Sequence, residues 1–106
     1  MIEFISVTIT VSSEAEAELI ARALVEEKLA ACVTLHPGVR SIYRWQGKIQ
    51  DDQEIVLIAK TRKDRFDALQ ARVVALHSYS CPCIVALPIV AGHQPYLDWL
   101  NAETKP

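Results

Sequence analysis

The sequence is poor in the residue patterns on which most enzymes depend. It contains only three glycines, Gly38, Gly47 and Gly92, so no glycine-rich loop is available to wrap phosphate groups. The nucleophile-elbow pattern G-x-S-x-G and the zinc-protease pattern H-E-x-x-H are both absent. The acidic residues lie on predicted helix faces and in segment 51–54, where a solvated surface is the usual explanation. We therefore expect a protein that is not an enzyme.

An excess of charge of one sign is also missing. The chain has 11 Lys and Arg against 13 Asp and Glu, a formal net charge of -2, which offers no electrostatic footprint for DNA or RNA. Residues 73–97 contain no charged side chain, but Pro82, Pro88 and Pro95 interrupt them and argue against membrane insertion. The N-terminus has no basic leader, so we expect a cytoplasmic location. The three cysteines are an odd number, so we expect reduced thiols.

What the sequence does contain is a dense apolar pattern, with 51% hydrophobic residues in a chain of 106. This length predicts a single domain over residues 1–106. A domain of this size buries only about two thirds of the surface of its unfolded chain. So much apolar surface on so small a domain indicates contacts between subunits.

Hydrophobic periodicity predicts a mixture of strands and helices. In chain order we expect a strand over 2–11, a helix from Ser13 to residues 29–31, a long strand over 32–45 bent at Pro37–Gly38, a turn at 46–48, a second long strand to residue 60, a helix from Asp64, a strand over 84–90, and a short C-terminal helix begun by Pro95.

This βαββαβ order predicts an α+β, ferredoxin-like fold, in which both central helices cover one face of an antiparallel sheet. The β-ribbon of residues 32–61 is longer than the other strands require. Its apolar and aromatic segment SIYRW favours pairing with another subunit over exposure to solvent.

Soft metal ligands are concentrated in one stretch, where His77, Cys81 and Cys83 lie within seven positions. Three alternatives compete with metal binding. Cysteines at i and i+2 of an extended segment point to opposite faces, and Cys83 suits the start of a buried strand. His77 suits the end of the second helix, where a protonated imidazole interacts favourably with the free backbone carbonyls of the last turn. Cys32 is either a core residue or a further ligand, whereas His36 and His93 fit surface turns.

Longer blocks of sequence are recognisable together: EEKLAACVTL (26–35), SIYRWQGKIQ (41–50), EIVLIAKT (54–61), HSYSCPCIVALPI (77–89) and YLDWL (96–100). In this order and spacing they resemble the CutA divalent-cation tolerance family. The resemblance implies a ferredoxin-like subunit in a cytoplasmic homotrimer, similar in architecture to PII signalling proteins. It also implies binding of copper or other divalent cations and a part in metal-ion tolerance.

Two kinds of site are expected. A metal ion is expected to bind through His77, with Cys32, Cys81 and Cys83 as candidate thiols chosen for their ligand type. Tyr43, Trp45, Lys60 and Tyr79 are expected to line a cleft between subunits.

The sequence departs from the family pattern at Cys83, where the family usually has glutamate. A thiol there favours copper(I) over hard cations. The alternative to metal handling is a PII-like sensor or adaptor that binds a small molecule or a protein partner in the intersubunit cleft.

Overall fold

A computed structural model describes all 106 residues of the chain and confirms the predicted order of elements. The elements are β1 (Phe4–Val11), α1 (Glu14–Glu26), β2 (Cys32–Trp45), β3 (Lys48–Arg62), a short 3-10 turn (Lys63–Arg65), α2 (Phe66–Leu76), β4 (Ile84–Pro88) and α3 (Gln94–Glu103).

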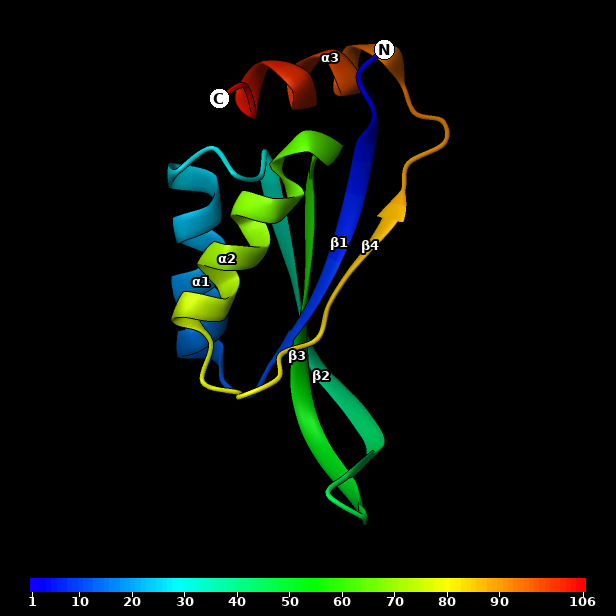
Figure 1. Cartoon of the computed structure of the whole chain (residues 1–106). Helices are drawn as coiled ribbons and strands as arrows, with labels where there is room; N and C mark the ends of the chain where they lie inside the picture. The colour runs from blue at the N-terminus through cyan, green and yellow to red at the C-terminus, as the bar shows by residue number, and fades with distance from the viewer.

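The strands form a four-stranded antiparallel sheet in the order β2-β3-β1-β4. Helices α1 and α2 lie side by side on one face of this sheet, while α3 lies across one end (Figure 1). This two-layer arrangement is the predicted α+β fold. None of the helices is both long enough and apolar enough to cross a membrane.

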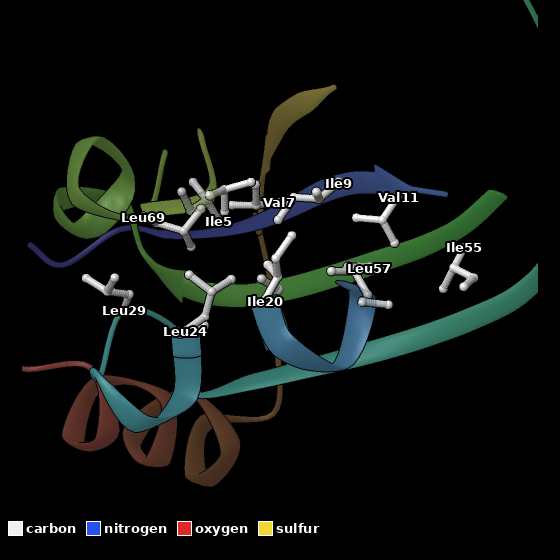
Figure 2. Packing of buried hydrophobic residues seen from close by; sticks show 14 residues of the cluster. Ile5, Val7, Ile9, Val11, Ile20, Leu24, Leu29, Ile55, Leu57 and Leu69 are labelled. Carbon is white, nitrogen blue, oxygen red and sulfur yellow. The ribbon is translucent and has the colours of Figure 1, made fainter. Parts of the chain in front are cut away.

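The core lies between the helix pair and the sheet. Every second residue of β1 is buried because neighbouring side chains of a strand point to opposite faces. Apolar side chains from β1, β3, α1 and α2 point toward one another in this layer (Figure 2). The fully buried members with the largest side chains include Ile9, Ile20, Leu24, Leu57 and Leu69.

The opposite face of the sheet is open except at one end, where Tyr96 of α3 contacts Cys32 and Lys60. On the open part, Val85 is 53% exposed and Leu87 is 60% exposed, both on the edge strand β4. Ile58 of the central strand β3 is half-buried on the same face, opposite Thr8 of β1. An apolar face of this kind is open for another protein surface.

Strands β2 and β3 continue beyond the end of β1 as a two-stranded ribbon, residues 39–54, which projects away from the rest of the molecule (Figure 1). The register shifts between His36 and Val39, so the predicted bulge at Pro37–Gly38 is confirmed. The turn at the tip places Gln46 at φ 51 and Gly47 at φ 79. Two successive positive φ values are typical of the tight hairpin turns that match strand twist.

The ends of helix α1 and strand β4 are among the element boundaries that differ from the prediction. Helix α1 ends at Glu26, earlier than expected, because Lys28 adopts a positive φ of 59 and Leu29 donates its N–H back to the Leu24 carbonyl at 2.9 Å. Strand β4 ends at Pro88, before residue 90, although Ile89 still donates its N–H to the Phe4 carbonyl of β1 at 2.9 Å.

Candidate functional site

A concave feature lined by aromatic, acidic and thiol side chains lies at the base of the ribbon. It is a cleft of about 450 Å³ between the ribbon and the loop that joins α2 to β4. One wall comes from β2 and β3, and the other from residues 79–83 of the loop. The lining residues are Thr10, Ser41, Tyr43, Trp45, Glu54, Tyr79, Ser80, Cys81 and Cys83.

Strand alternation forms the ribbon wall. Ser41, Tyr43 and Trp45 share one face of β2 because they are two residues apart. On β3 the pairing partner of Ser41 is Asp52, and Glu54 lies two residues further on the same face. Their neighbour Asp51 points to the other face and forms an ion pair with Arg40.

The side chain of His77 holds in place the loop wall of the cleft, residues 79–83. Its side chain has no exposed surface, and its Nε2 lies 2.7 Å from the Thr10 carbonyl oxygen, to which it donates. Its Nδ1 accepts the backbone N–H of Tyr79 at 3.0 Å. These two bonds require the neutral imidazole with its proton on Nε2.

Glu16 holds the next residue of the same loop. It accepts the Ser78 N–H at 2.8 Å and the Ser78 hydroxyl at 3.1 Å. Helix α1 and strand β1 therefore both position the loop, through Glu16 and through the Thr10 carbonyl. Tyr79, directly after these anchors, is presented to the cleft.

Two tyrosines donate hydrogen bonds to the carboxylates of the ribbon. The Tyr79 hydroxyl donates to Glu54 Oε2 at 2.9 Å, and the Tyr43 hydroxyl donates to Asp52 Oδ2 at 2.6 Å. Burial and then the Glu54 hydrogen bond raise the pKa of Tyr79 to about 12. The hydrogen bond to Asp52 likewise raises the pKa of Tyr43. Both phenols stay protonated as donors at neutral pH.

The structure brings Cys81 and Cys83 to the same cleft, and both are exposed. The expectation that Cys83 begins a buried strand is wrong, because β4 begins one residue later and Cys83 stays in the loop. The strand-alternation argument that separated the two thiols assumed an extended segment. Residues 78–81 are bends, and Pro82 and Cys83 belong to no strand, so the segment lacks the regular alternation that the argument needs.

Cys32 and Lys60 lie elsewhere in the chain. They are opposite each other on β2 and β3, and Lys60 is six residues beyond Glu54, about 20 Å along the strand. Cys32 Sγ lies 3.3 Å from the Tyr96 hydroxyl, and Lys60 Nζ lies 5.9 Å from the centre of the Tyr96 ring. The Cys32 contact, with burial, raises the pKa of Tyr96 to about 12. Within one chain, Lys60 does not join Tyr43, Trp45 and Tyr79.

The comparisons with known proteins agree on a family. The family model described as CutA1 divalent ion tolerance protein matches residues 5–103. The chain belongs to this family. It is 57% identical over 98 residues to the divalent-cation tolerance protein CutA of Thermus thermophilus, covering 92% of this chain and 95% of that protein. It is 44% identical over 101 residues to the chloroplastic protein CutA of Arabidopsis thaliana, covering 95% of this chain but 56% of that longer protein.

Solved structures of the family share the fold. The divalent cation tolerance protein of Thermus thermophilus superposes with a TM-score of 0.93 at 55% identity, covering 99% of this chain and 100% of that one. CutA1 from Oryza sativa superposes with a TM-score of 0.95 at 43% identity, covering 98% and 95%. These likenesses extend over the ribbon and the cleft loop as well as the core.

In this CutA1-family chain the predicted metal ligands do not converge. No group of three or more His, Cys, Asp or Glu side chains is arranged to hold a metal ion. Cys81 and Cys83 share the cleft, His77 lies beneath it with both ring nitrogens engaged, and Cys32 is at the other end of the sheet.

Sequence reasoning missed the acidic residue that lines the cleft, Glu54. It treated segment 51–54 as a solvated surface, but Glu54 is only 6% exposed and that expectation is wrong for it. A signal was available, because Glu54 directly precedes the apolar run IVLIA and lies on the strand that pairs with the one carrying Tyr43 and Trp45.

Proposed function

We propose that this chain contributes to divalent-cation tolerance as a cytoplasmic homotrimer that binds a soft metal ion, copper above all, through Cys81 and Cys83. The observation that carries the proposal is the shared position of the two thiols in one cleft of a CutA1-family fold. Thiolate sulfur prefers copper(I), and a coordinated thiol loses its proton. The proposal contains no catalytic step.

In this proposal His77 is not expected to bind the metal ion before the two cysteines do. To bind a metal ion it would have to release either the Thr10 carbonyl or the Tyr79 N–H, because both ring nitrogens are already bonded. Loss of either bond leaves a buried backbone group without a partner. Cysteine ligation is therefore expected first, and Cys32 is too far along the sheet to join it within the same chain.

The trimer is supported by surface that a lone chain leaves open. The uncovered sheet face carries Val85 and Leu87, and both sheet edges, β2 and β4, lack a neighbouring strand. The free ribbon presents Trp45, which is 43% exposed. Pairing of these edges between subunits buries apolar surface and satisfies open backbone groups at the same time.

The test is an anaerobic titration of reduced protein with copper(I), combined with sedimentation to measure the mass of the assembly. We expect binding at a fixed ratio per trimer in the parent, and loss of at least ten-fold in affinity in both Cys81→Ser and Cys83→Ser. Cys32→Ser is the matched control and should bind like the parent. Equal affinity in all the variants would refute the thiol site, and a monomeric mass would refute the trimer.

A further inference from the structure

Glu54 is a buried carboxylate whose charge is not balanced within the chain. It is 6% exposed, and none of the ion pairs of the chain includes it. Its Oε2 accepts the Tyr79 hydroxyl at 2.9 Å, which is its one side-chain hydrogen bond. Ionised carboxylates are rarely so buried unless a positive charge balances them. No Lys, Arg or His side chain lines the cleft that Glu54 faces, so the balancing charge comes from another molecule.

In the proposed trimer, on which this inference rests, a second copy of the chain covers the cleft. The ribbon and the open sheet face around the cleft are the surfaces that lie between subunits. Contacts in a ring of three identical chains are head-to-tail, so one surface of a subunit meets a different surface of the next. The group that enters the cleft is therefore a side chain from another part of this same sequence.

Lys60 is the cation of the open sheet face that is free to pair with another subunit. It shares that face of β3 with Glu54, about 20 Å along the strand, because side chains an even number of residues apart point the same way. It forms no ion pair, and its Nζ lies 5.9 Å from the centre of the Tyr96 ring, near the limit of a cation–π contact. Arg62, the next cation on this face, is already bound to Asp64.

The open face of β3 carries opposite charges toward its two ends. Asp52 and Glu54 lie at the ribbon end, Lys60 lies toward the α3 end, and the half-buried apolar residues Val56 and Ile58 lie between them. Head-to-tail packing of two such faces brings unlike charges together, whereas two acidic ends or two basic ends in contact repel each other. The charge pattern therefore favours Lys60 of one copy against Glu54 of the next.

The cleft also suits the rest of a lysine side chain. Tyr43 and Trp45 line it with aromatic rings, against which an alkyl stem packs and whose negative faces attract an ammonium group. Its volume of about 450 Å³ leaves room for a long, unbranched side chain.

We propose that Lys60 of the neighbouring subunit enters this cleft in the trimer, where its ammonium group pairs with the Glu54 carboxylate and its alkyl stem lies against Tyr43 and Trp45. The cleft is then built from two subunits, with one such pair at each subunit contact. Removal of either member leaves the other charge buried and unpaired, so assembly depends on both.

A double-mutant cycle tests the pair without introducing a new charge. Glu54→Gln keeps an acceptor for Tyr79, and Lys60→Met keeps an unbranched stem. The readout is the protein concentration at which half of the chains sediment as trimer, in a urea concentration that makes this midpoint measurable for the parent. We expect each single variant to raise the midpoint about ten-fold or more. The double variant should stay within about three-fold of the weaker single variant, because the second change removes a charge that is already unpaired. Effects that simply multiply would overturn the proposal.

Lys48 provides the matched control. It is the other lysine on this face of β3, at the ribbon tip, and it also forms no ion pair. Lys48→Met should move the midpoint less than about two-fold and should show no coupling to Glu54→Gln. Coupling of Glu54 to Lys48 in place of Lys60 would overturn the assignment.

Charge reversal shows that the pair forms between chains. Glu54→Lys alone places two lysines at every contact, and Lys60→Glu alone places two glutamates there, so neither variant should sediment as trimer at a concentration where the parent does. Coexpression of the two variants restores opposite charges at all but one contact of a mixed trimer and should recover the trimeric mass. No recovery from two variants with the circular dichroism spectrum of the parent would overturn the proposal. If either variant does not fold, the neutral cycle decides.

The outcomes also separate this inference from the proposed function. A monomeric parent would refute the trimer and the pair together. A trimeric parent in which Glu54 and Lys60 show no coupling would refute the pair alone.

Discussion

Replacing His77 with alanine should destabilise the chain by about 3 kcal/mol. The imidazole has no exposed surface, and its removal leaves the Thr10 carbonyl and the Tyr79 N–H without partners. Each unsatisfied buried group costs about 1–3 kcal/mol, and the cavity left by the ring adds to that cost. The expected loss is large because a single ring joins strand β1 to the cleft loop.

The measurement is urea unfolding followed by circular dichroism, at one fixed protein concentration because assembly shifts the midpoint. His77→Gln keeps an N–H donor for the Thr10 carbonyl and should recover about half of the loss. His36→Ala is the matched control, since His36 is exposed and its removal should cost less than about 0.5 kcal/mol. A loss below about 1 kcal/mol for His77→Ala would refute the structural role and leave metal ligation as the reason for the residue.

Other predictions concern the core, the open sheet face, the ribbon tip and the cleft. Leu57→Ala, at a fully buried position, should lower the free energy of unfolding by about 2–5 kcal/mol in the same assay. Ile58→Lys, one residue later but on the open face, should keep the circular dichroism spectrum and reduce the sedimenting mass; an intact trimer would contradict the assigned interface. Gly47→Ala, at φ 79, should cost about 1 kcal/mol in thermal unfolding, and an unchanged midpoint would contradict the turn geometry. The Tyr79 phenol should titrate near pH 12 by ultraviolet absorbance, a step missing in Tyr79→Phe; since its pKa lies above the ordinary 10.0, its contribution to stability is complete below pH 10 and is lost as pH rises through about 12.

Local patterns predicted the elements well because their causes are local. The capping pattern at Ser13 starts α1, where the Ser13 hydroxyl accepts the Glu16 N–H at 3.2 Å. The run of β-branched residues in β1 and its alternating burial follow from the two-residue period of a strand. The bulge at Pro37–Gly38 was visible because proline and glycine have few other uses within a strand.

The cleft was harder to predict because its walls are far apart in the sequence. The ribbon wall ends at Glu54 and the loop wall begins at Tyr79. Hydrogen bonds from His77 to β1, from Ser78 to Glu16 of α1 and from Tyr79 to Glu54 fix the loop beside the ribbon. Sequence reasoning therefore found Tyr43, Trp45 and Tyr79 by resemblance but grouped Lys60 with them, although it lies at the other end of the sheet within the chain.

Periodicity, turn residues and blocks of recognisable sequence were enough to predict the elements, their order, the long ribbon and the family. The burial of Glu54, the shared cleft of Cys81 and Cys83 and the buried position of His77 became visible in the folded chain alone. Burial and partnership depend on which distant segments pack together, and strand order and loop path set that packing.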